Sequence, residues 1–421
     1  MPNPTRARPG HGGRFACAVA AAILLAGAMG GCKQRGLGFG EGNDASFAAL
    51  DDRGRAGRPL SVVFFGGSLT WGTGASDPQR TSYRALTSAY LRRRYPKSPI
   101  AFHDAAVGGT GSKLGLFRLD RDVLAHRPDL VFLEFAAADD LSGTDTPTLA
   151  AHETLLREMI RRGVPVIQVL LGFRRNFQPR FQPRTVPRYQ AHLRLARAYR
   201  TGTADSFPYV QQRLDDRLTT PDRIWPIDGA GPGDEGYELF YEAVRNGFDR
   251  AVRERRTCLL PDEPVFGLYR TRRRRLLAQQ PMPIGWGRRK PYRTSLRFDG
   301  LSSRWMGDVT VCNASDGTVV QPWRLRFEGT LLGVFGEADE NGLGFRVFVD
   351  GKLIRYAPPQ EPASAVWPAD TKRFGTGKLL FWRVISTTLP PGPHKVEIRP
   401  VIAPDAPAGQ LRIESLCTAG P

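Results

Sequence analysis

Cysteine is scarce in this chain, with five residues among 421. Cys258, Cys312 and Cys417 are the three that lie outside the N-terminal region, and none has the neighbours of a zinc or iron–sulfur site. The sequence therefore predicts no metal site and no other cofactor. Cys312 and Cys417 fall on the apparent first and last strands of one C-terminal unit. In an exported protein these two could form a disulfide, which would leave Cys258 unpaired.

Long apolar runs are also absent from the interior of the chain, so no interior segment is expected to cross a membrane. The N-terminus differs, because Arg6, Arg8 and Arg14 precede the short apolar segment FACAVAAAILLAGAMGGC, which ends at Cys32. This order is typical of a lipoprotein-type export signal over residues 1–32, with Cys32 as the lipidation site. An ordinary secretory signal and an uncleaved anchor are the alternatives. All three place the protein outside the cytoplasm, and the first predicts a membrane-anchored lipoprotein facing the periplasm or the cell surface.

Acidic residues are outnumbered, since 60 Lys and Arg face 41 Asp and Glu, and the formal net charge is +19. A basic protein favours anionic surroundings such as acidic polysaccharide, lipid head groups or nucleic acid. The densest basic run, Arg270–Arg275, has no nucleic-acid-binding motif beside it, and export argues against a genomic partner. We therefore predict no nucleic-acid partner and interpret the run as part of a solvated linker.

The length of the chain favours two domains over a single core. Residues 33–57 are rich in Gly, Asp and Arg without periodicity, which indicates a linker. Residues 58–255 alternate strand-like apolar runs with helical patterns. Residues 256–292 are rich in Pro and Arg and are predicted to be a second linker, and residues 293–421 form a further domain.

The strand-like runs of residues 58–255 are nearly continuous in apolar residues, as strands buried on both faces must be. They are LSVVFF, PIAFHDAAV, PDLVFLEFA and VPVIQVLL, and the helical patterns are TSYRALTSAYLRRRYP, TLAAHETLLREMIRRG and DEGYELFYEAVRNGFDRAVRERR. A strand–helix–strand series implies right-handed crossovers and a parallel sheet covered by helices. Active sites of such sheets lie beyond the carboxyl ends of the strands, and Ser68 follows the first strand directly.

The C-terminal residues 293–421 read as alternating strands without an obvious catalytic cluster. Within them, VDGK is a hairpin signal, because Asp-Gly suits the primed turn types. The pattern predicts an all-β sandwich. Exposed tryptophans among Trp305, Trp323, Trp367 and Trp382 could stack on sugar rings, although burial in the core is the commoner fate of such residues.

Two blocks of the first domain, FFGGSLTWGTGASD and DAAVGGTGSKLGLFRLDRDVLAHRPDLVFLEFA, resemble the SGNH or GDSL-type hydrolases over roughly residues 60–250. The resemblance implies a three-layer α/β/α, flavodoxin-like domain with a parallel sheet. It also implies a hydrolase of carboxylic esters, and many bacterial members of the family deacylate carbohydrates. The C-terminal sandwich is similar in a general way to carbohydrate-binding jelly rolls that accompany some of these esterases.

Carried over by position, the resemblance makes Ser68 the nucleophile, although the residue before it is Gly67 where the family often has Asp. Gly109 matches the glycine whose backbone N–H helps to hold the oxyanion, and the Ser68 backbone N–H is the second donor. Attack on an ester places negative charge on the carbonyl oxygen, and preorganised donors there lower the barrier. In the last block, Asp228 matches the acid that orients a catalytic histidine.

Two positions depart from the family pattern. Ala138 stands where the family has Asn, and a methyl group cannot donate the third hydrogen bond to the oxyanion. Gly231 stands where the family has the histidine that takes the serine proton. A serine hydroxyl is a poor nucleophile without such a base, so the second departure is expected to reduce catalysis more than the first.

The chain has six histidines, few enough to consider each one as a replacement base. His152 opens a helix after the third strand, at the edge of the sheet where Ser68 lies, and it is the only plausible stand-in. A solvent-facing histidine on that helix is the alternative interpretation.

Two functions follow from these residues. The first is an exported SGNH-type esterase that removes acyl or acetyl groups from carbohydrate or another small ester, with impaired activity. The second is a catalytically inactive SGNH-fold protein that binds carbohydrate or acts as a scaffold, because loss of Asn and His together is what drift after loss of activity would produce.

Overall fold

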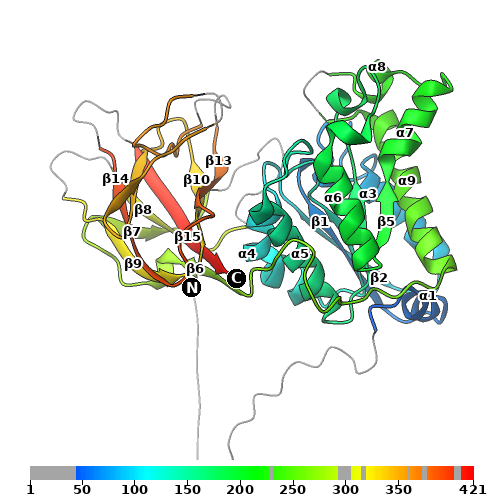
Figure 1. The fold of residues 1–421 in the computed structure, drawn as a ribbon, viewed down its shortest axis with the longest axis horizontal. Coiled ribbons are helices and arrows are strands. Elements are labelled where there is room, and N and C mark those ends of the chain that lie inside the picture. The colour runs from blue at the N-terminus through cyan, green and yellow to red at the C-terminus, as the bar shows by residue number, and fades with distance from the viewer. Residues whose placement is uncertain are drawn as a thin grey trace, which may run out of the picture. The chain divides into compact units, whose positions relative to one another are not determined.

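The structure is a computed structural model, and it describes residues 44–227, 231–292, 305–313, 319–358, 361–371, 377–402 and 409–421. Helices and strands alternate up to residue 253, and strands dominate after it (Figure 1). The signal segment and Cys32 lie outside the described residues, so their interpretation stays a prediction. No helix in the described ranges has the length and hydropathy needed to cross a bilayer.

The first domain is built on a five-stranded parallel sheet in the order β2-β1-β3-β4-β5, which is the flavodoxin-like order. The strands are β1 (Leu60–Gly66), β2 (Ile100–Ala106), β3 (Leu130–Glu134), β4 (Val166–Leu170) and β5 (Gly202–Asp205). β3 and β4 are buried at every position, which requires cover on both faces. The predicted fold class of this domain is confirmed.

Helices cover this sheet, and α3 packs beside α9 while α4 packs beside α5. The helices are α1 (Phe47–Arg55), α2 (Ser68–Trp71), α3 (Tyr83–Arg94), α4 (Ser112–Asp122), α5 (Thr146–Ile160), α6 (Pro187–Ala198), α7 (Ser206–Asp215), α8 (Pro221–Ile224) and α9 (Asp234–Arg253), with short 3₁₀ turns at Leu124–His126, Arg174–Phe177 and Pro183–Thr185. Side-chain caps begin several of them: Ser82 accepts from Ala85 N before α3, and Asp145 accepts from Thr148 N before α5.

The C-terminal region consists of two antiparallel sheets, which confirms the predicted β-sandwich class. The larger sheet has the order β13-β10-β15-β8-β7 with β6 also paired to β15, and the smaller has the order β12-β11-β14-β9. The strands are β6 (Thr271–Leu276), β7 (Trp286–Arg289), β8 (Val309–Asn313), β9 (Trp323–Glu328), β10 (Leu331–Ala338), β11 (Phe345–Val349), β12 (Lys352–Ile354), β13 (Leu379–Ser386), β14 (Pro393–Pro400) and β15 (Gln410–Gly420), with a 3₁₀ turn at Leu277–Gln279.

The hairpin predicted at VDGK joins β11 to β12. Asp350 and Gly351 both have positive φ, 50° and 80°, as a type I′ turn requires. Trp305, Trp323 and Trp367 are buried in the core, so they are not exposed platforms for sugar rings.

Both predicted linkers are wrong in part, because structured elements lie within them. In residues 33–57, α1 places Phe47 fully inside the core, and the Phe47 N–H donates to Arg256 O. In residues 256–292, β6 and β7 join the larger sheet. The Arg270–Arg275 run is therefore not a solvated linker: Arg274 forms a 2.7 Å salt bridge with Glu414, which is fully buried on β15. Pairing with β15 gives this basic run both backbone partners and a counter-charge.

A disulfide between Cys312 and Cys417 is absent, and both thiols are free and buried, as is Cys258. Leu411 of β15 lies opposite Cys312, whereas Cys417 is six residues further along β15. That separation is about 20 Å along a strand, and bonded cysteines need Cα atoms within about 7 Å. Burial raises the pKa of each of these two thiols to about 12, so both remain protonated and unreactive at neutral pH.

Candidate active site

Ser68 stands on a tight turn at the carboxyl end of β1. The strand ends at Gly66, Gly67 precedes the first turn of α2, and Ser68 is the first residue of that turn. A Cβ on Gly66 would lie 2.2 Å from Thr70 Oγ1, and one on Gly67 would lie 2.8 Å from the Ala138 Cβ. The close approach of these neighbours is the reason for two successive glycines before the serine. Ser68 itself is partly exposed, and its hydroxyl makes no hydrogen bond with any residue that the structure describes.

The loops that follow β1, β2 and β3 meet at this turn, because the carboxyl ends of parallel strands lie at one edge of the sheet. The Val107 N–H donates to Gly66 O at 3.1 Å, which ties the loop after β2 to the end of β1. The Gly67 N–H donates to Glu134 O at 3.3 Å, which ties in the end of β3. Gly109 has a φ of +72° and open space around the position of a Cβ. The structure thus brings Ser68, Gly109 and Ala138 to one edge, although no ligand defines their roles.

The loop after β3 exposes Ala138 and turns Asp139 inward toward the start of α4. The Asp139 carboxylate accepts from the Ser112 N–H at 2.8 Å and from the Ser112 hydroxyl at 2.5 Å. Burial raises the pKa of Asp139 to about 6, against the opposing effect of the hydrogen bonds from Ser112. A Cβ on Gly111 would lie 2.0 Å from Asp139 Oδ1, so Gly111 allows this contact. Asp139 therefore joins the loop that carries Gly109 to the loop that carries Ala138.

Gly231, which the sequence resemblance aligns with the family histidine, packs backbone to backbone against the loop after α2. A Cβ on Gly231 would lie 1.9 Å from Thr73 O, and one on Gly74 would lie 2.6 Å from Pro232 O. The Tyr237 hydroxyl holds Thr73 O in this place at 2.9 Å. The space that a histidine side chain would need is therefore filled by the main chain of residues 73–74. Asp228, the expected acid, lies outside the described residues.

The same loop is fixed to the start of α9 by Asp234. Its carboxylate accepts from the Ser76 N–H at 2.8 Å, from the Ser76 hydroxyl at 2.5 Å and from the Thr81 hydroxyl at 2.7 Å. These three hydrogen bonds, from two residues of one loop, restrict how far residues 73–81 can move away from Gly231.

His152 is not a replacement base, and it is not a solvent-facing residue either. It is 1% exposed, with Nδ1 3.2 Å from Ser112 Oγ and Nε2 3.1 Å from Gln168 Oε1. Burial lowers the pKa of His152 to about 4, so the ring is neutral at physiological pH. The physical reason is the orientation of α5, whose residues at this position face β4 and α4. In the described part of the chain, no histidine forms a hydrogen bond with Ser68.

Glu134 is a buried acid behind the serine turn that sequence reasoning missed. It accepts from the Thr70 hydroxyl at 3.2 Å and from the Ala137 N–H at 3.4 Å, and it is fully buried. Desolvation raises the pKa of Glu134 to about 7. Its signal in the sequence is a lone carboxylate at the end of the apolar run LVFLE. The residue connects the end of β3 to α2 from the inner side.

A flavodoxin-like sheet with a serine turn directly after β1 is the arrangement of the SGNH hydrolases. The family model described as "GDSL-like Lipase/Acylhydrolase family" matches residues 64–239, which include the serine turn and most of the α/β domain. No curated protein gives a significant match to the chain.

Two solved structures resemble both domains together. A two-domain esterase active on acetylated mannans, co-crystallized with mannopentaose, is 21% identical with a TM-score of 0.67, and the match covers 88% of this chain and 94% of that one. A second structure of a two-domain esterase active on acetylated mannans is 20% identical with a TM-score of 0.63 and the same coverage. At this identity the likeness shows a shared fold, an α/β domain followed by β sheets.

Proposed function

We propose that this protein is an exported hydrolase that removes acyl groups, most simply acetyl, from carbohydrate, and that it turns over slowly. The observation that carries the proposal is the hydroxyl of Ser68, which is unbonded among the described residues and stands at the meeting point of three loops. The family of the α/β domain supports ester hydrolysis, and the fold shared with an esterase of acetylated mannans supports a carbohydrate ester as substrate.

In the proposed reaction Ser68 Oγ attacks the ester carbonyl and the sugar leaves as its alcohol, and water then hydrolyses the acyl-serine to release the carboxylic acid and free Ser68. The Ser68 and Gly109 N–H groups donate to the oxyanion, and Ala138 supplies no donor. The serine proton must pass to water or to a carboxylate such as Asp228, and both are weaker bases than histidine. Removal of a triad member leaves about 10³–10⁴-fold acceleration over the uncatalysed reaction in serine hydrolases, so a measurable but slow rate is expected.

The test compares the purified protein with Ser68→Ala on p-nitrophenyl acetate and on acetylated mannan. Ser142→Ala is the matched control, because its hydroxyl contacts only the side chain of Asp140 at the surface. Acetate release that Ser68→Ala abolishes and Ser142→Ala leaves unchanged supports the proposal. Equal rates in all three proteins contradict it.

A second function, carbohydrate binding without catalysis, is favoured by the packing of Thr73 against Gly231. In that packing, Thr73 O lies where a side chain at residue 231 would begin, which supports a site without a histidine there. Binding of mannopentaose by a protein that releases no acetate from any ester would support this second function.

Export as a lipoprotein is part of the proposal and rests on residues 1–32 of the sequence. Expression in a bacterial host with labelled palmitate tests it. Incorporation that Cys32→Ala removes is the expected result, and an unlabelled membrane-free protein is the contrary one.

A further inference from the structure

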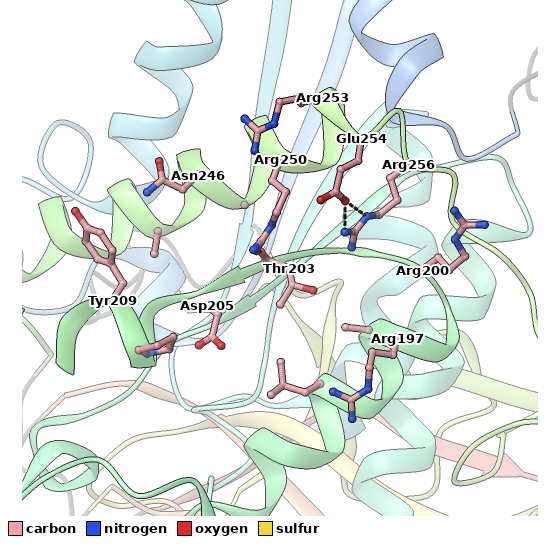
Figure 2. Close-up of a pocket in the computed structure, with 15 residues that line it drawn as sticks. Arg197, Arg200, Thr203, Asp205, Tyr209, Asn246, Arg250, Arg253, Glu254 and Arg256 are labelled. Carbon is pink, nitrogen blue, oxygen red and sulfur yellow. Dashed lines mark hydrogen bonds and ion pairs between the residues drawn. The ribbon is translucent and has the colours of Figure 1, made fainter. Parts of the chain in front are cut away.

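A groove of about 770 Å³ runs along the outer edge of β5, away from the serine turn (Figure 2). β5 is the edge strand, since it pairs only with β4, and it lies three strands from β1. At the usual strand spacing this is about 14 Å across the sheet. The groove is lined by Leu193, Ala196, Arg197, Arg200, Thr203, Asp205, Pro208, Tyr209, Ala243, Asn246, Gly247, Arg250, Arg253, Glu254 and Arg256.

Five arginines line this groove against two acids, and two of the five have partners within the chain. Figure 2 shows Arg250 reaching from α9 toward β5, where it donates to Thr203 O at 3.2 Å. Arg256 forms an ion pair with Glu254 and donates to Thr201 O at 2.8 Å. These two arginines satisfy backbone carbonyls at the sheet edge and contribute to the fold.

The side chains of the remaining three, Arg197, Arg200 and Arg253, form no hydrogen bond or salt bridge with the residues that the structure describes. The second acid of the groove, Asp205, already accepts from the Tyr189 hydroxyl at 2.7 Å and from the Phe207 N–H at 3.1 Å. Cations that outnumber the acids along one concavity raise the local concentration of anions.

The shape and the lining select the class of anion. A guanidinium group binds a carboxylate through two parallel hydrogen bonds. The hollow shape disfavours a flat lipid surface, and its volume is in the usual range for small-molecule sites. The ring of Tyr209 and the side chains of Leu193 and Ala196 add carbon surface of the kind that the faces of sugar rings contact.

We infer that the groove along β5 binds an acidic oligosaccharide, a sugar chain whose carboxylate groups pair with Arg197, Arg200 and Arg253. The site is separate from Ser68 and goes beyond the proposed function, because it binds a glycan whether or not the chain hydrolyses esters. It would hold the protein on an anionic polysaccharide.

The test is titration calorimetry of the whole protein with hexagalacturonate, and with xylohexaose as the uncharged oligomer of equal length. The groove variant is Arg197→Gln/Arg253→Gln, which removes two exposed side chains that form no hydrogen bond or salt bridge with the described residues. The matched control is Arg93→Gln/Arg255→Gln, which removes the same charge from exposed positions outside the groove. Melting temperatures of both variants verify that they fold.

The expected result is binding of hexagalacturonate that weakens with salt, no binding of xylohexaose, and affinity about tenfold lower in the groove variant. The control variant should stay within about twofold of the parent protein. Equal weakening in both variants would overturn the inference, because only net charge would then matter. Binding to phosphatidylglycerol vesicles that the groove variant loses, without binding to hexagalacturonate, would overturn it too and assign the groove to lipid head groups.

Discussion

A substitution at Gly231 tests most directly whether the main chain of residue 73 closes the space that a side chain at residue 231 would need. In Gly231→Ala, the new Cβ would begin 1.9 Å from Thr73 O, and real Cβ atoms do not approach below about 3.0 Å. The backbone of residue 73 must therefore move by about 1 Å. Because Thr73 O also accepts from the buried Tyr237 hydroxyl, that move strains or breaks a second contact.

The expected cost follows from these two effects. Overpacking costs about 1–3 kcal/mol, and loss of a partner for a buried hydroxyl adds about 1–3 kcal/mol. We expect a loss of about 3 kcal/mol, which lowers the melting temperature of a domain of this size by about 6–12 °C. Gly231→His would carry the same cost, so restoring histidine alone should not restore activity.

Differential scanning calorimetry measures the effect. Gly287→Ala is the matched control, because the nearest atom to its Cβ is the end of the Arg289 side chain at 3.6 Å. This control should change the melting temperature of the protein by less than about 2 °C. If Gly231→Ala melts like the control, the loop of residues 73–74 yields easily, and our account of a closed histidine position is wrong.

Three further predictions concern the other loops and the core. Ala138→Asn restores an amide beside the serine turn and should raise kcat/KM on p-nitrophenyl acetate by about 10–100-fold, and an unchanged rate would place residue 138 away from the oxyanion. The folded state keeps a proton on Glu134 up to its pKa of about 7, whereas the unfolded chain releases it near 4.5. The free energy of unfolding should therefore fall by about 3 kcal/mol as pH rises from about 4.5 to 7. In urea titrations at pH 5 and 8, Glu134→Gln should show a smaller fall than the parent protein. An equal fall in both proteins would contradict the raised pKa of Glu134. Glu153→Gln should lower the free energy of unfolding by about 2–3 kcal/mol in the same titrations. The Glu153 carboxylate accepts from Val265 N at 2.6 Å with one oxygen and from Phe266 N at 2.7 Å with the other, whereas an amide can accept at only one of these atoms. A loss below about 0.5 kcal/mol would show that these bonds contribute little.

The strands of the α/β domain were predictable where apolar runs were long. β1 to β4 and the helices α3, α5 and α9 all coincide with patterns visible in the sequence. β5 was missed because its four residues, GTAD, contain no apolar run and lie at the sheet edge. Helix α1 was missed because the segment is rich in Gly, Asp and Arg and has no clear apolar periodicity. The burial of Phe47 depends on contacts with the distant end of α9, which the local sequence does not indicate.

The candidate site, too, could be predicted only in part from the sequence. Proximity of Ser68, Gly109 and Ala138 could be predicted, because all three follow parallel strands and such strands end at one edge. The burial of His152 could not, because a helical pattern does not say which neighbour a polar side chain on the inner face will meet. Pairing of β6 with β15 joins residues far apart in the sequence, so composition alone suggested a linker.

Sequence alone determined the alternation of strands and helices, the place of Ser68 after β1, and the absence of Asn and His at residues 138 and 231, because these are local patterns or residue identities. Tertiary structure decided what those residues contact. Gly231 is closed off by Thr73, Asp139 holds two loops together through Ser112, and arginines from α6, from the turn before β5 and from α9 line one groove. Each of these depends on which distant segments pack together, and packing is set by the whole core rather than by neighbours in the chain.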